Sequence, residues 1–295
     1  MDTIAILMPG DMGHAVGRVL KEHGHRVLTA LAGRSARTRG LAETGGLEDV
    51  AEIDALVGEA DLILSILPPA RAVQQARLVA AAMTKTGDRA VFVDCNAVSP
   101  ATAEEISEII SQAEAPFIDA GIIGLAPGKG PATRFYVSGS DTGPMEALDG
   151  KGFEVIAIGD GAGRASALKM CYAGLTKGTW SLFTAVLVTA EVLGVRGELC
   201  DEFAFSQQAA FAAMRERVPR LPADSVRWIG EMEEIAATFA AAGTPSGFHE
   251  SAAEIFRLLA ATPFASETRE TIDTSRTLED AIPAYARELE RARRK

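Results

Sequence analysis

The first 160 residues alternate short apolar runs with helical patterns, and this alternation constrains the fold more than any other feature. Apolar runs of strand length occupy residues 3–8, 25–31, 61–67, 90–95, 117–121, 134–138 and 154–158. Helical spacing lies between them, for example over residues 12–23 and 101–113. Strands that alternate with helices of this length predict a parallel sheet with helices on both faces.

The remainder of the chain carries a different pattern. From Ala162 onward there is no convincing strand, only helical segments rich in Ala and Leu. Their breaks fall at residues 218–224, 243–247 and 262–265. A continuous helix that begins near Gly163 is expected to join the two halves. The sequence therefore predicts an α/β domain over residues 1–160 and an all-helical domain over residues 161–295.

The charge balance limits the expected partners. The 295 residues include 40 Asp and Glu against 29 Lys and Arg, which gives a net charge of −11 at pH 7. Such a field repels phosphate backbones and anionic lipid, so nucleic acid and membrane surfaces are not expected as partners. A small-molecule substrate is the expectation that remains.

The sequence offers no pattern typical of export, a membrane span or a metal site. The N-terminus has no basic region before its first strand pattern, so we expect no signal peptide. The apolar stretch 180–195 is interrupted by Glu191, and it is shorter than the ~20 residues that span a bilayer. Three widely spaced cysteines fit neither a disulfide framework nor a metal-ligand spacing. We therefore predict a cytoplasmic protein without a bound metal.

A glycine-containing loop follows the first predicted strand and opens the first helix. Folds that bind dinucleotides need glycine here, for a tight turn and for close approach of the backbone to a pyrophosphate. Met8 stands where the first of these glycines belongs, and ordinary turns between strand and helix use glycine too. On its placement after a strand at the start of the chain, we predict cofactor contacts from Pro9, Gly10, Asp11, Met12 and Gly13.

The segment after the second predicted strand favours NADP(H). A site for NAD normally places an acid at the end of this strand, where it holds the ribose 2′-hydroxyl. Residues 29–39 contain no acid and three arginines. Arg34, Ser35 and Arg37 can neutralise and hydrogen-bond a 2′-phosphate, so we predict NADP(H) as the cofactor. The alternative is a solvated basic loop.

Two further strand ends reach the carboxyl edge of the predicted sheet, where open α/β sheets bind ligands. There we predict cofactor contacts from Leu67, Pro68 and Asn96. The alternative is that these segments only start helices, as Ser99 before Pro100 is suited to do. Together these features predict a Rossmann-type, doubly wound N-terminal domain followed by an all-α C-terminal domain.

The order of the motifs resembles one family. The glycine loop is followed by Leu-Pro-x-x-x-x-Val from Leu67, by Asp-x-Asn-x-x-Ser-Pro-x-Thr from Asp94, by Asp-Ala-x-x-x-Gly from Asp119, and by Lys169 in a helical segment. Over nearly the whole chain this resembles the β-hydroxyacid dehydrogenases, relatives of 3-hydroxyisobutyrate and 6-phosphogluconate dehydrogenase. The helical half resembles a bacterial subgroup with a phosphogluconate-dehydrogenase-like C-terminal domain. The resemblance implies an active site in the cleft between the domains and a homodimer through the long first helix of the helical domain.

The resemblance also implies that Lys169 is the catalytic lysine, which begins a Lys-x-x-Asn motif in the family. Tyr172 takes the place of that Asn here, so we predict Lys169 and Tyr172 as the catalytic residues. From the residues alone, Lys169 is an ammonium on an otherwise apolar helix, and such a group can lose its proton or donate it to a developing alkoxide. The alternative is a lysine that extends to solvent at a helix start. Lys177, two turns later, is expected to be exposed or at an interface.

Substrate contacts are expected at six positions: Asn96, Ile122, Ile123, Gly124, Glu231 and His249. Ile123 replaces a serine that in the family is expected to hold a substrate carboxylate, so the substrate is expected to be bulkier or less carboxylate-like. For Glu231 the alternative is a solvated helix face. For His249, a group suited to proton transfer or anion binding, the alternative is a helix cap.

We therefore expect an NADP(H)-dependent oxidoreductase that acts on the CH–OH or C=O group of a small hydroxyacid-like substrate. Decarboxylation of a β-carboxylated product is left open. Two other functions compete with this one. An imine reductase would share the scaffold, but those enzymes typically lack the lysine. A regulator that binds NADPH without catalysis is the other alternative.

Overall fold

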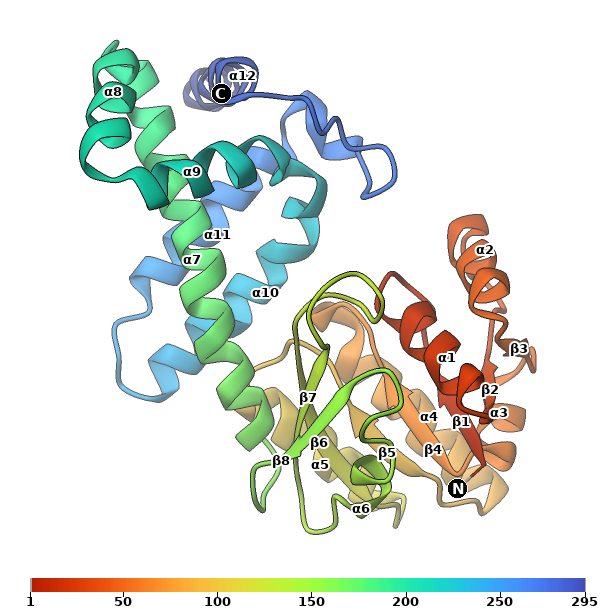
Figure 1. The fold of residues 1–295 in the computed structure, drawn as a ribbon. Helices are drawn as coiled ribbons and strands as arrows, with labels where there is room; N and C mark the ends of the chain where they lie inside the picture. The colour runs from red at the N-terminus through yellow and green to blue at the C-terminus, as the bar shows by residue number, and fades with distance from the viewer. Residues whose placement is uncertain (1, 295) are drawn as a thin grey trace. The chain divides into compact units, whose positions relative to one another are not determined.

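The computed structural model describes residues 2–294 and confirms the predicted fold class (Figure 1). One eight-stranded sheet has the order β3-β2-β1-β4-β5-β6-β7-β8. Its strands are β1 (Thr3–Ile6), β2 (Arg26–Thr29), β3 (Glu48–Asp49), β4 (Leu62–Ser65), β5 (Val91–Asp94), β6 (Phe117–Ile123), β7 (Arg134–Ser138) and β8 (Glu154–Ala157). The strand order reverses direction after β1, as it does in doubly wound folds.

Two features of the sheet differ from the prediction of a parallel sheet. β7 pairs antiparallel with β6, whereas every other pair of neighbours is parallel. The reason is that the glycine-rich segment 124–133 returns the chain without a crossover helix. The short edge strand β3 was also not predicted, because its two residues, Glu48 and Asp49, are acidic and exposed.

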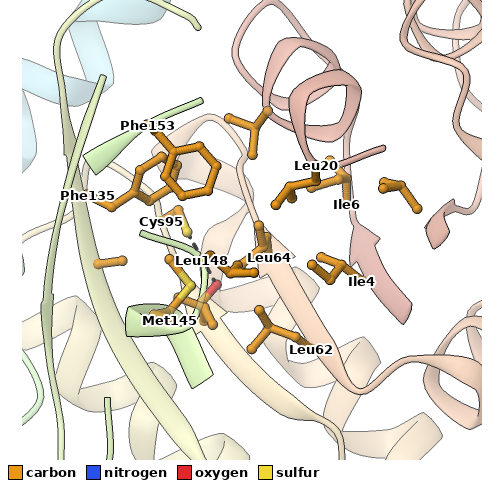
Figure 2. Packing of buried hydrophobic residues seen from close by; sticks show 14 of the residues in the cluster. Ile4, Ile6, Leu20, Leu62, Leu64, Cys95, Phe135, Met145, Leu148 and Phe153 are labelled. Atoms are coloured by element: carbon orange, nitrogen blue, oxygen red, sulfur yellow. Dashed lines mark hydrogen bonds between the residues drawn. The ribbon is translucent and has the colours of Figure 1, made fainter. Parts of the chain in front are cut away.

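Six helices connect the strands: α1 (Gly13–Glu22), α2 (Ala36–Gly45), α3 (Ile53–Glu59), α4 (Ala72–Thr86), α5 (Pro100–Gln112) and α6 (Gly143–Glu146). Hydrophobic clusters fill both faces of the sheet. Ile4 and Ile6 of β1 belong to the cluster drawn in Figure 2, while Ala5 and Leu7 belong to the second cluster. Because both faces are buried, the strands are continuous apolar runs, and this made them recognisable in the sequence.

The chain forms two compact units, Met1–Met170 and Cys171–Lys295. The division falls inside α7 (Arg164–Val192), the helix that was expected to begin near Gly163. The second unit continues with α8 (Arg196–Ser206), α9 (Gln208–Arg217), α10 (Pro222–Ala241), α11 (Gly247–Ala260) and α12 (Leu278–Arg293). No strand follows Ala157 among the described residues. The assignment of residues 1–160 and 161–295 to separate functions stays a prediction.

None of the helices within residues 2–294 combines the length and the apolar character that a membrane span requires. Over the same residues, no group of three or more His, Cys, Asp or Glu side chains gathers as a potential metal site.

Candidate active site

The glycine loop lies between β1 and α1 at the carboxyl edge of the sheet. A Cβ added at Gly13 would stand 2.4 Å from the carbonyl oxygen of Met8, so only glycine fits this turn. A Cβ added at Gly10 would meet nothing within 4 Å. Met12, at the start of α1, makes no side-chain cap to the amides of the first turn. An open loop beside a helix N-terminus without a side-chain cap suits the pyrophosphate of a dinucleotide.

The arginines after β2 reach back to this loop. The Arg37 guanidinium pairs with the Asp11 carboxylate at 2.7 Å. Arg34 donates a hydrogen bond to the Leu7 carbonyl oxygen at 3.4 Å. Ser35 caps α2 by accepting from the Thr38 backbone amide at 3.2 Å. The structure therefore brings the predicted 2′-phosphate residues and the predicted pyrophosphate loop together, since ion pair and hydrogen bond both join the two segments.

Asn96 ties the ends of β4 and β5 together. Its Oδ1 accepts from the Leu67 backbone amide, and its Nδ2 donates to Ser65 Oγ at 3.1 Å and to Asp94. The side chain is buried. Its amide is thus engaged within the protein and holds the segment that enters Pro68, which was predicted to contact the cofactor.

Lys169 lies where β6 and the start of α7 meet. Its Nζ donates to the carbonyl oxygen of Ile122. A Cβ added at Gly121 would stand 2.8 Å from the Ala165 carbonyl oxygen and 2.9 Å from Lys169 Cβ, so α7 rests directly on the backbone of β6. The predicted Asp-Ala-x-x-x-Gly segment and the predicted catalytic lysine are therefore neighbours in the fold.

The substrate residues predicted on this segment present different groups. The side chain of Ile122 is buried in the same hydrophobic cluster as Ile4 and Ile6, whereas its carbonyl oxygen accepts the hydrogen bond from Lys169. Ile123 is partly exposed, and Gly124 is exposed with φ +112°. Their contacts with a substrate remain predictions.

Replacing Gly121 by alanine is expected to lower the free energy of unfolding by about 1–3 kcal/mol, because the added methyl group forces α7 away from β6. Urea denaturation measures the change. Gly40→Ala is the matched control, since Gly40 lies in α2 with open space around it. That substitution is expected to raise the free energy of unfolding by roughly 0.5–1 kcal/mol, because alanine favours a helix over glycine. Equal stability of the wild type and Gly121→Ala would contradict the close contact.

In the helical unit, Glu231 is buried and its carboxylate is fully engaged. One oxygen pairs with Lys177 and the other with Arg227 at 3.2 Å. The alternative of a solvated face for Glu231 is therefore wrong, and a role in substrate binding remains a prediction. Lys177 was expected to be exposed or at an interface; it is instead buried within the chain, where it pairs with Glu231 of α10.

His249 lies buried on α11 against α7. Its ring contacts those of Phe239 and Phe248, and Gly174 and Gly178 on α7 leave room for it. Burial lowers the pKa of the imidazole, and Nδ1 has no hydrogen-bond partner among the described residues. It does not cap the helix, which begins two residues earlier at Gly247.

Tyr172, placed by the sequence at the family's Asn position, lies on α7 and is 47% exposed.

Sequence reasoning missed a buried row of polar side chains that crosses the sheet. Ser65, Asp94, Asp119 and Ser138 are register neighbours on β4, β5, β6 and β7, and all four are fully buried. Polar residues within four apolar runs were the available signal.

Comparisons with known proteins agree with this geometry. Residues 3–149 match the NAD-binding domain of 6-phosphogluconate dehydrogenase, and residues 190–259 match a domain of unknown function, DUF1932. An uncharacterized 28.5 kDa protein from the 7S RNA 5′ region of Methanothermus fervidus is 30% identical over 177 residues, which are 59% of this chain and 66% of that protein.

Solved structures share the fold. A conserved protein of unknown function, described as similar to 3-hydroxyacid dehydrogenases, is 26% identical with a TM-score of 0.65, over 87% of this chain and 96% of that one. The 3-hydroxyisobutyrate dehydrogenase of Mycobacterium tuberculosis is 22% identical with a TM-score of 0.66, over 99% of both chains. Imine reductases and reductive aminases share the fold as well.

The fold and the match over residues 3–149 define an NAD(P)-binding domain of the kind found in 6-phosphogluconate dehydrogenase. The chain belongs to the β-hydroxyacid dehydrogenase-like family.

Proposed function

We propose that the protein is an NADP(H)-dependent oxidoreductase that acts on the CH–OH or C=O group of a small hydroxyacid-like substrate. The observation that carries the proposal is the position of Lys169. Its Nζ reaches from α7 to the Ile122 carbonyl oxygen of β6, in a chain that has a dinucleotide-binding domain. The side chain of Lys169 is half-buried and its Nζ turns back to β6, unlike a lysine that extends to solvent.

The chemistry divides between cofactor and protein. A bound nicotinamide supplies or takes up the hydride. Lys169 Nζ serves as the proton carrier at the substrate oxygen, taking the hydroxyl proton in oxidation and returning it to the carbonyl oxygen in reduction. The Ile122 carbonyl restricts where Nζ points, so the proton is delivered from one direction.

The preference for NADP(H) is supported by Arg34 and Arg37, which flank the cap of α2 and contact the glycine loop. An arginine fork fits a phosphate dianion better than the ribose hydroxyl of NAD. Asp11 neutralises part of the Arg37 charge, which reduces what Arg37 contributes to the preference.

The test is to mix the protein with NADP⁺ and a panel of 3-hydroxyacids and polyol acids, and to follow the absorbance of the reduced cofactor. At least one member is expected to be oxidised, and NAD⁺ is expected to be the poorer acceptor. Released CO₂, measured in the same reactions, decides whether a product is also decarboxylated. Tight NADPH binding without turnover on the whole panel would favour the regulator instead.

An imine reductase is the competing enzyme, since such enzymes share the fold. Lys169 favours a reaction at oxygen, because an ammonium can protonate a developing alkoxide. Cyclic imines are therefore added to the panel in the reducing direction. Faster reduction of an imine than of any carbonyl compound would replace the proposed reaction.

We also propose a homodimer through the helical unit, in the cytoplasm. Exposed apolar side chains gather on α7 and α8 and between them: Leu175, Leu182, Leu193, Val195 and Phe205. None of the α8 residues is buried within the chain. Phe203 contacts the ring of Phe211 on α9, but Phe205 is 83% exposed, which suits an interface with a second copy. The three cysteines are free thiols, as a reducing compartment requires.

The test of the dimer introduces a negative charge by Leu182→Glu on α7. The wild type is expected to elute as a dimer in size-exclusion chromatography with light scattering, and Leu182→Glu as a monomer, because a buried charge without a partner opposes association. Val226→Glu is the control, since Val226 is also an exposed apolar residue but lies on α10. A monomeric wild type, or a variant that stays dimeric, would contradict the proposal.

A further inference from the structure

Asp119 is a fully buried carboxylate in the middle of the sheet, on β6. Burying a carboxylate is costly unless hydrogen bonds compensate it. Burial raises the pKa of the Asp119 carboxyl, and the hydrogen bonds it accepts oppose this rise. A hydrophobic residue would fill the same place at no such cost, so the charge calls for a role.

The partners of Asp119 lie at the start of α7. Its oxygens accept from the Ser166 backbone amide at 2.9 Å, from Ser166 Oγ at 2.7 Å and from Ser138 Oγ at 3.3 Å. Ser138 Oγ in turn accepts from the Ala165 backbone amide at 3.0 Å. Ala165 and Ser166 are the second and third residues of α7, whose first amides need acceptors from outside the helix.

The sheet therefore supplies the cap of α7 that a residue of the helix itself would normally supply. The negative charge also faces the positive end of the helix dipole. The hydrogen bonds and the charge together fix the position of the first turn of α7 along the helix axis, and its rotation, relative to β6.

Lys169 lies one turn after Ser166, and β6 contacts α7 at three successive places. Asp119 accepts a hydrogen bond from the Ser166 amide. Gly121, without a side chain, allows Ala165 and Lys169 to approach the strand closely. The Ile122 carbonyl oxygen accepts a hydrogen bond from Lys169 Nζ. A rotation of the first turn would carry Nζ away from Ile122, because the helix is rigid over this distance.

We propose that Asp119 is a positioning residue for Lys169, and that Ser138 completes the anchor. The functional meaning of this anchor rests on the proposed role of Lys169 as proton carrier. That Asp119 fixes the position of Lys169 does not depend on this role, and it can be tested without a substrate.

The experiment labels the lysines of the full-length protein by reductive ¹³C-methylation and follows their NMR signals with pH. Lys169→Arg identifies the signal of Lys169, and Lys177, also on α7, is the internal control. In Asp119→Asn the chemical shift of the Lys169 signal is expected to move toward those of exposed lysines, while the Lys177 signal stays in place. Ser138→Ala is expected to move the Lys169 signal in the same direction by less.

Hydrogen exchange gives a second readout on the same variants. The amides of Ala165 and Ser166 are expected to exchange about tenfold faster in Asp119→Asn, because each loses an acceptor or the charge behind it. Amides in the second half of α7 are expected to be unchanged.

Two outcomes would overturn the positioning role. In the first, the Lys169 signal of Asp119→Asn matches the wild type. In the second, the Lys169 and Lys177 signals move together in both variants, which makes Asp119 a residue of general stability. If Asp119→Asn does not fold, the milder Ser138→Ala decides between the same outcomes. Turnover that survives Lys169→Ala would remove the proposed function while the NMR result stands, so the two failures are distinguishable.

Discussion

Replacing Lys169 by alanine is expected to lower turnover by about 10²–10⁴-fold, the range typical for loss of a general acid–base group. Binding of NADPH is expected to be unchanged, because no predicted cofactor contact involves Lys169. Steady-state rates with a substrate found in the panel measure the first effect, and fluorescence titration with NADPH measures the second.

Lys85→Ala is the control for this prediction. Lys85 pairs with Asp54 at the end of α4, which leads into the start of β5 and so lies at the opposite edge of the sheet from the glycine loop. Exposed pairs contribute little to stability, so the control is expected to retain wild-type rates. Equal rates for Lys169→Ala and the wild type would remove Lys169 from the reaction.

The second large effect concerns the cofactor. Arg34→Ala and Arg37→Ala are each expected to weaken NADPH binding by roughly tenfold to a hundredfold, because a hydrogen bond to a charged group contributes about 1.5–3 kcal/mol. The affinity for NADH is expected to change little, since it has no 2′-phosphate. Calorimetric titration of both cofactors gives the ratio directly.

The Asp11–Arg37 pair predicts an asymmetry between the two arginines. A 2′-phosphate competes with Asp11 for Arg37, whereas Arg34 contacts only a backbone carbonyl among the interactions resolved for its side chain. The loss is therefore expected to be larger for Arg34→Ala. Asp11→Asn is the matched variant and is expected to tighten NADPH binding. Unchanged NADPH affinity in both arginine variants would place the 2′-phosphate elsewhere and leave NADP(H) without support.

Much of the fold could be predicted from the sequence because buried parallel strands are continuous apolar runs. Seven of the eight strands were found in this way, and the helix that begins near Gly163 was expected from the loss of strand patterns. The direction of β7 could not be predicted, since an apolar run is the same in a parallel and an antiparallel pair. β3 has too few apolar residues to carry any pattern.

Site residues that lie in local sequence motifs could be predicted, whereas residues whose environment is set by tertiary contacts could not. The glycine loop and Lys169 lie in recognisable patterns. The partners of Asp119 lie 19 and 47 residues away in the chain, so its function as a cap was not visible. The burial of Glu231 depends on Lys177, 54 residues earlier on a different helix, and this pairing turned an apparently solvated acid into an interior one.

The central claim is hydride exchange between NADP(H) and a substrate carbonyl, and deuterium transfer tests it most directly. The protein is incubated with the carbonyl forms of the hydroxyacid panel and with NADPH deuterated at one or the other face of C4. The masses of the products are measured by mass spectrometry. The account predicts that one of the two deuterated cofactors yields a hydroxyacid heavier by one deuterium, and that Lys169→Ala forms it far more slowly. Products without deuterium from both cofactors, in a protein that binds NADPH, would contradict it.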